Sequence, residues 1–82
     1  MLPPRKFSSV WAAAALVTFD RLPIHSATRL DRAVMLFAET GRGHIDWVAP
    51  YYRLHVGSFY LLLAIDRSAG VLSVLAIRRR HS

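Results

Sequence analysis

The feature that most constrains the fold of this chain is a change in its hydrophobic period near Tyr51. Between Leu30 and Ala38, apolar residues recur every three or four positions, which is the spacing of one helix face. Between Tyr51 and Val56, apolar and polar residues alternate, which is the spacing of a strand with one buried face. Helices therefore come first and strands follow. This order predicts an α+β fold in which helices cover one face of a sheet.

Two helices are expected in the first half of the chain. Residues 10–21 contain four consecutive alanines, the strongest helix former, and this helix should end before Pro23. Thr28 followed by Asp31 resembles a capping box at the start of a second helix, with Asp31 in place of the usual glutamate. Gly41 stands where a left-handed residue commonly ends a helix. These signals predict a helical hairpin with a proline in its turn.

The second half predicts three strands joined by short turns. The expected strands are Tyr51–Val56, Phe59–Ile65 and Val71–Ile77. Residues 57–58 should form a tight turn and residues 66–70 a hairpin loop, whereas residues 41–50 are expected to be a loop containing two glycines. The predicted fold is therefore two N-terminal helices packed on a three-stranded antiparallel sheet. A possible short extra edge strand lies within residues 1–7, where two prolines limit pairing.

The size and composition predict one domain, residues 1–82, without a cofactor or a metal. A chain of 82 residues that is 54% hydrophobic and 20% charged is able to form one core. The absence of cysteine excludes disulfides and thiolate metal sites. The four histidines lack the spacing of a metal site, and the sequence has neither a nucleophile elbow nor a glycine-rich phosphate loop. Enzyme classes that depend on these motifs are thereby disfavoured.

The charge of the chain favours a polyanionic partner. Eleven Lys and Arg residues oppose five Asp and Glu residues, which gives a formal net charge of +6. All but one of the basic residues are arginine, whose planar guanidinium matches phosphate and carboxylate groups. A charge of this size on a small domain attracts polyanions over several ångströms. An arginine-rich host proteome is the alternative explanation of the same composition.

Basic and aromatic residues coincide on the predicted sheet. Arg53 and His55 point the same way because they are two residues apart on one strand, and Tyr51 and Tyr60 offer stacking surfaces. Arginine and aromatic rings together are typical of proteins that bind single-stranded RNA. The candidate RNA-binding residues are Arg53, Arg78, Arg79, Arg80 and Tyr51. The alternative is a merely solvated sheet face followed by a frayed arginine tail.

Residues 52–60 read YRLHVGSFY and are followed by an apolar strand, a hairpin, residues 71–75 and an arginine-rich end. These segments, in this order, resemble the RelE/ParE superfamily of bacterial toxins. Leu22 and Pro23, followed by the helix through Leu30, are similar to the segment around the second helix of that family. The resemblance covers roughly residues 19–80. It implies a cytoplasmic toxin of a type II toxin–antitoxin pair, with an antitoxin protein as partner and no membrane.

The resemblance also implies the chemistry. Members of the RelE branch cut messenger RNA in the ribosomal A site, which would make this chain a metal-independent, ribosome-associated endoribonuclease. Arg53 and Arg79 match positions that the family fills with arginine and would hold the phosphate, and His55 or His81 would move protons. Tyr60 stands where the family usually has arginine, and the sequence after Arg80 is short.

Three alternatives stay open at the level of sequence. Members of the ParE branch poison DNA gyrase, so gyrase is a second candidate target. A catalytically inactive relative that only binds an antitoxin is the next. The third is a small exported or membrane-associated basic protein, because the apolar run of residues 10–19 follows Arg5 and Lys6 as in a signal peptide.

Overall fold

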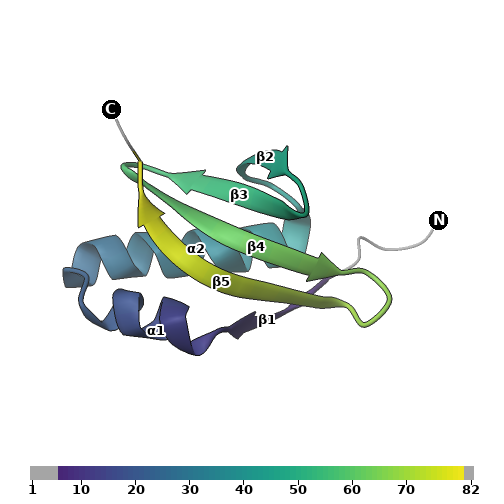
Figure 1. The fold of residues 1–82 in the computed structure, drawn as a ribbon, viewed down its shortest axis with the longest axis horizontal. Helices are drawn as coiled ribbons and strands as arrows, with labels where there is room; N and C mark the ends of the chain where they lie inside the picture. Colours follow the sequence, from purple (N-terminus) through teal and green to yellow (C-terminus); the bar gives the residue numbers. More distant parts are fainter. Residues whose placement is uncertain (1–5, 81–82) are drawn as a thin grey trace.

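The computed structural model describes residues 6–80, which form two helices and five strands (Figure 1). In chain order the elements are β1 (Ser8–Trp11), α1 (Ala13–Asp20), α2 (Ile24–Thr40), β2 (His44–Val48), β3 (Tyr51–Val56), β4 (Phe59–Asp66) and β5 (Val71–Arg79). The strands make one sheet in the order β1-β5-β4-β3-β2. β1 pairs parallel with β5, and the other neighbouring strands pair antiparallel.

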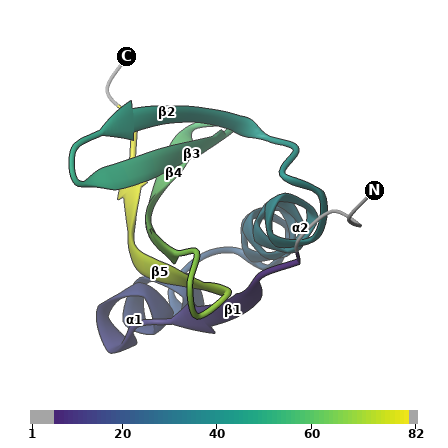
Figure 2. The same cartoon turned by 90° about the vertical axis from the view of Figure 1, so that its right-hand side faces the viewer.

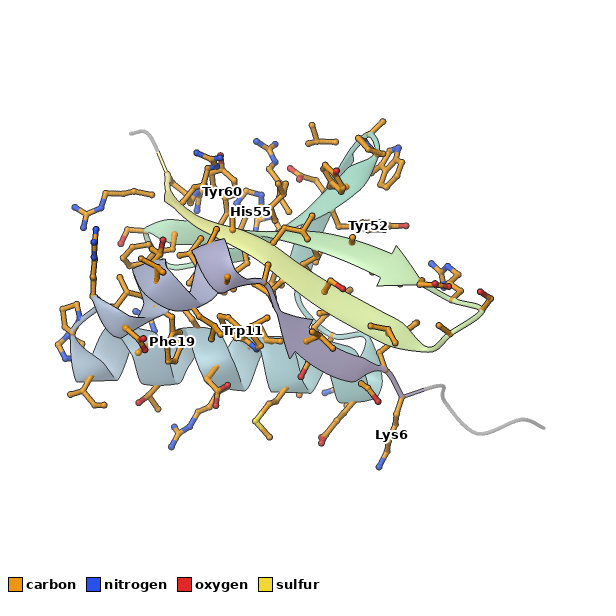
Figure 3. All side chains as sticks on the ribbon, turned by 60° about the horizontal axis from the view of Figure 1, so that its bottom comes forward. Lys6, Trp11, Phe19, Tyr52, His55 and Tyr60 are labelled. Carbon is orange, nitrogen blue, oxygen red and sulfur yellow. The ribbon has the colours of Figure 1, made fainter. Side chains whose placement is uncertain are left out.

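The helices and the sheet share a single core, and the strands curve around α2 (Figure 2). Every element from α1 to β5 except β2 contributes a buried apolar side chain to it. The buried cluster consists of Ala15, Leu30, Val34, Phe37, Leu54, Leu61, Leu63, Leu72, Val74 and Ile77. Trp11 and Phe19 lie on this helix side of the sheet, whereas His55 and Tyr60 lie on its other side (Figure 3). The side away from the helices is hereafter called the open face.

The predicted three-stranded antiparallel sheet is wrong, because the sheet has five strands and is mixed. One added strand is β1, which takes Val10 and Trp11 away from the expected helix of residues 10–21, so that α1 begins at Ala13. Trp11 packs edge-to-face on Phe19, with ring centroids 5.1 Å apart, and the Ala12 N–H donates to the Val74 carbonyl. Pairing with β5 and burial of the indole therefore outweigh the helix propensity of the alanine run. The extra edge strand exists, but it lies after residues 1–7.

The other added strand is β2, which occupies most of the loop expected at residues 41–50. It pairs antiparallel with β3 along its whole length. Ile45 packs against the core, and the Trp47 ring lies 4.8 Å from that of Tyr52 on the neighbouring strand. Such cross-strand pairs stabilise β2 as a strand. The glycines and the proline that flank it are typical of loops, which is why the sequence predicted a loop here.

Helix α2 begins four residues before the expected cap. Pro23 directly precedes it, and Thr28 lies inside the helix, where its hydroxyl donates to the Ile24 carbonyl over 2.8 Å. The predicted apolar stripe is confirmed as the buried face of α2. Gly41 is confirmed as the C-cap: it has a φ of 76°, and its N–H donates to the Phe37 carbonyl.

The three predicted strands are present as β3, β4 and β5, joined by the two expected turns. The pairing of β4 with β5 contains one irregularity, between Leu62 and Leu63, and β5 continues to Arg79. The apolar run of residues 10–19 is divided between β1 and α1. No helix within residues 6–80 is long and apolar enough to cross a membrane.

Candidate functional site

Polar side chains gather on the open face where β2, β3 and β4 lie side by side. Asp46 on β2 is directly opposite Arg53 on β3, and His44 is opposite His55. His55 is in turn opposite Tyr60 on β4. Residues that oppose each other across neighbouring strands share a face, so the alternation within three short strands brings these side chains together.

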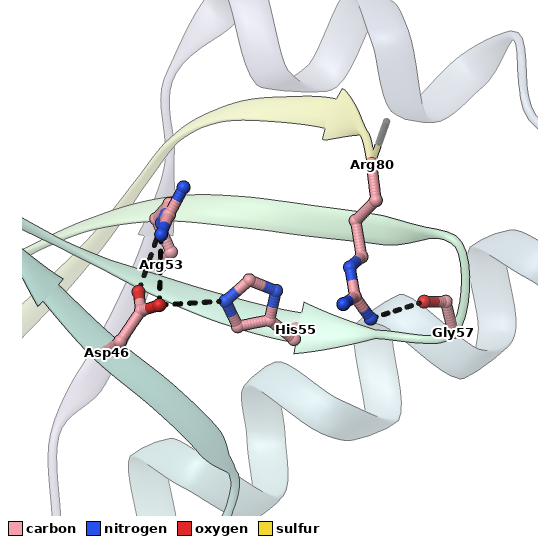
Figure 4. A network of polar contacts seen from close by, with 5 residues as sticks. All are labelled: Asp46, Arg53, His55, Gly57 and Arg80. Carbon is pink, nitrogen blue, oxygen red and sulfur yellow. Dashed lines mark hydrogen bonds and ion pairs between the residues drawn. The ribbon is translucent and has the colours of Figure 1, made fainter. Parts of the chain in front are cut away.

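Asp46 and Arg53 form a two-pronged ion pair at the centre of this group (Figure 4). Arg53 donates from Nε to Asp46 Oδ1 and from Nη2 to Asp46 Oδ2, each over 3.0 Å. The hydrogen bonds from Arg53 hold the pKa of the Asp46 carboxyl below its ordinary value, and the carboxylate raises the pKa of Arg53. Asp46 uses neither hydrogen on Nη1, so Arg53 keeps donors for a second anion.

His55 contacts the same carboxylate. Its Nε2 lies 3.3 Å from Asp46 Oδ2, and its side chain is only 12% exposed. Because a carboxylate accepts and never donates, Nε2 carries a hydrogen, and a neutral His55 therefore has its free lone pair on Nδ1. Nδ1 is buried and has no hydrogen-bond partner within the described part of the chain. An orphaned buried acceptor in a polar site is a candidate for contact with a ligand.

These residues line an open groove of about 450 Å³. The lining side chains are His44, Asp46, Arg53, His55, Tyr60 and Arg80. The His55 ring lies 5.1 Å from that of His44 and 6.0 Å from that of Tyr60, and the Arg53 guanidinium lies 5.5 Å from the centre of the Tyr60 ring. The groove thus combines cations, imidazoles and a carboxylate, which is equipment for binding an anion and for moving a proton.

The structure brings some of the predicted site residues together and separates others. Arg53, His55 and Arg80 line the groove, and Arg78 is opposite Tyr60 and therefore shares the open face. Arg79 is opposite Phe59 instead, with its guanidinium 5.6 Å from the centre of that ring, on the helix side of the sheet.

Two further predicted residues lie away from the groove or beyond the described chain. Tyr51 is on the open face opposite Val48, at the far end of β3 from the turn at Gly57, and it does not line the groove. His81 lies outside the described residues.

Sequence reasoning missed Asp46 and His44, because both were assigned to a loop. A signal was present: residues 44–48 read HIDWV, in which polar His44 and Asp46 alternate with apolar Ile45 and Trp47. Within residues 6–80, no three His, Asp or Glu side chains are arranged to hold a metal ion. The hydrogen bonds place a carboxylate, Asp46, between Arg53 and His55 at the centre of the site.

The comparison with solved structures finds the same architecture in a chain of the RelBE2 toxin–antitoxin complex from Mycobacterium tuberculosis. The TM-score is 0.66 at 18% sequence identity, and the match covers 92% of this chain and 99% of the other. The two chains share a fold. This finding supports, at the level of fold, the RelE-type resemblance that residues 52–60 suggested. No protein-family model and no curated protein matches the sequence.

Proposed function

We propose that this protein is the toxin of a toxin–antitoxin pair and that it cleaves messenger RNA in the groove on its open face. The observation that carries the proposal is the group Asp46, Arg53 and His55, placed in a basic groove on a fold shared with a chain of a toxin–antitoxin complex. The RNA and ribosome specificity comes from the family resemblance of the sequence.

Cleavage of RNA without a metal needs three groups. A base removes the proton of a ribose 2′-hydroxyl, which attacks the neighbouring phosphorus; cations stabilise the charge on the phosphate oxygens; an acid protonates the departing 5′-oxygen. The products are a 2′,3′-cyclic phosphate and a 5′-hydroxyl. In the groove, Arg53 supplies the cation through Nη1 while Asp46 fixes the plane of its guanidinium.

His55 is the base in this scheme. Asp46 accepts from Nε2 and thereby leaves the lone pair on Nδ1. Because neighbouring side chains cover Nδ1 in this structure, they must shift when RNA binds before Nδ1 receives the proton. The second proton carrier is His44, which lines the same groove, or His81, the candidate from the sequence. Arg79, which the resemblance placed in the catalytic set, contacts Phe59 on the helix side and takes no part in the scheme.

The test is a translation reaction programmed with a defined message, in which cleaved ends are mapped with and without ribosomes. We expect the wild-type protein to cut the message and to leave 2′,3′-cyclic phosphate ends. An intact message in both reactions would eliminate the nuclease proposal. Inhibition of DNA gyrase supercoiling by the same preparation would then favour the gyrase-directed alternative.

We infer further that an acidic antitoxin segment covers α1. Leu16 and Val17 are consecutive on this helix and are 45% and 53% exposed, so they offer an apolar surface that a partner can cover. Met35 and Leu36 on α2 form a similar exposed pair, at 50% and 48%, and provide the comparison. An amphipathic acidic segment would bury both side chains and offset the charge. Replacing Leu16 and Val17 with Gln should weaken binding of the cognate antitoxin by about tenfold or more.

The matched control for this change is Met35→Gln, which alters a side chain that is 50% exposed on α2. It should leave antitoxin binding within about twofold of the wild-type value, since surface substitutions away from a contact have small effects. Equal binding of the α1 double variant and the Met35 variant would contradict the placement on α1.

A further inference from the structure

A second basic hollow lies across the β3–β4 turn from the groove. It has a volume of about 40 Å³ and is lined by Ser26, Arg29, Leu30, Val56, Ser58 and Phe59. Arg29 and the two serines supply donors at its rim, and none of the lining residues is acidic. The hollow admits one small polar group and is too small for a base or a sugar.

Gly57 separates this hollow from the groove. On one side, Arg80 Nη1 donates to the Gly57 carbonyl over 3.4 Å, and Arg80 also lines the groove (Figure 4). On the other side, the Arg29 guanidinium lies so close that a β-carbon at Gly57 would be 3.0 Å from Nη2 and 3.3 Å from Nη1. The φ of Gly57 is 59°, a backbone conformation that favours glycine. One residue is thus flanked by two guanidinium groups.

Arg29 differs from Arg53 in having no acidic partner. No carboxylate forms an ion pair with it in the described part of the chain, whereas Asp46 occupies two donors of Arg53. A third cation lies at the same turn, because Arg79 sits over Phe59, which lines the hollow. The arginines around the turn therefore form a positive surface with unused donors.

We propose that this hollow is a second phosphate site, which holds a backbone phosphate of the RNA strand whose cleaved nucleotide lies in the groove. The inference rests on the proposed function. Guanidinium and hydroxyl donors without a nearby carboxylate match a phosphate group. Arginines on both sides of Gly57 suit a ligand that repeats its charge along its length, as an RNA strand does. An acidic antitoxin segment is the competing occupant, and the measurements below separate the two. The strand would leave the groove by crossing the β3–β4 turn.

The experiment measures the affinity of the full-length protein for a short single-stranded RNA whose riboses are 2′-O-methylated, so that no cleavage occurs, as a function of salt. Each phosphate contact on a single strand contributes roughly 0.7 to the slope of log K against log salt. Arg29→Gln should reduce the slope by about that amount, whereas the matched control Arg42→Gln should leave it unchanged. Arg42 follows the other end of α2, roughly 20 Å away along the helix axis.

Ser58→Ala provides a second measurement that alters no charge. Loss of its hydrogen bond to the phosphate should weaken binding by about threefold to tenfold with the slope preserved. If the wild-type protein does not bind the RNA, this inference and the proposed function both fail. If it binds, but Arg29→Gln and Arg42→Gln have the same slope or Arg29→Gln weakens only antitoxin binding, the second phosphate site alone is refuted.

Discussion

The two faces of the sheet differ in composition, and neighbouring residues of one strand belong to different faces. On β3, Leu54 points to the helix side and is 1% exposed, whereas Arg53 and His55, on either side of it, point to the open face. The helix side holds the apolar contacts that stabilise the fold. The open face holds the polar side chains that contact one another and line the groove. A change on the helix side should therefore affect mainly stability, and a change on the open face should affect mainly the proposed activity.

The largest expected effect is on the helix side. Leu61 on β4 is fully buried, and Leu61→Ala should lower the free energy of unfolding by about 2–5 kcal/mol because it removes buried methyl groups and leaves a cavity. The next residue, Leu62, is half-buried on the open face, and Leu62→Ala should cost only about 1 kcal/mol. Urea unfolding of both variants measures the difference. Similar costs for the two would show that the faces are not divided as described.

The next effect contrasts two arginines on opposite faces. If the groove cleaves RNA as proposed, Arg53→Ala removes the donor assigned to the phosphate and should slow cleavage by about a hundredfold to a thousandfold, as does loss of a charge-stabilising donor in other enzymes. Arg79→Ala removes the same charge on the helix side and should slow cleavage by less than about tenfold. Rates of message cleavage with saturating ribosomes measure both. A larger effect for Arg79 than for Arg53 would move the catalytic centre away from the groove.

The smallest effect is on the pH dependence of stability. The hydrogen bonds from Arg53 lower the pKa of Asp46 below its ordinary value of 3.8, so the folded state holds its carboxylate more strongly than the unfolded chain does. This contribution is complete above about pH 5 and is lost as the pH falls below 3.8 and through the lowered pKa. The stability difference between wild type and Asp46→Asn, from urea midpoints, should therefore shrink toward pH 2.

Asp66 requires a control for this experiment. Its pKa is also lowered, by the Ser68 hydroxyl and the Ala69 N–H, so the Asp46 variant will itself lose stability in acid. Only the difference between wild type and variant reports on Asp46. A difference that stays constant from neutral pH to pH 2 would mean that the ion pair seen on the open face does not persist in solution.

Local sequence patterns determined the middle of the fold and part of the site. The stripe of α2 with its Gly41 cap, the alternation of β3 and the turns on either side of β4 each depend on residues close in the chain. For the same reason, the sequence placed Arg53 and His55 on one polar strand face. Hydrophobic period and turn-forming residues are local properties of the sequence, so they predict these elements without knowledge of the strands that pair with them.

Only the tertiary structure decided the edges of the sheet and the centre of the site. β1 forms because it pairs with β5, about sixty residues later, and β2 forms because it pairs with β3. The local sequence indicates otherwise, since the alanine run beside β1 favours a helix and the glycines before β2 favour a loop. Once β2 lies beside β3, Asp46 reaches Arg53 and His55. Arg78 and Arg79 must lie on opposite faces because successive residues of a strand point in opposite directions. The register of β5 on β4 decides which face each takes: Arg78 is opposite Tyr60 on the open face, and Arg79 is opposite Phe59 on the helix side. Long-range pairing sets these positions, and its free energy lies in contacts that no local window of the sequence contains.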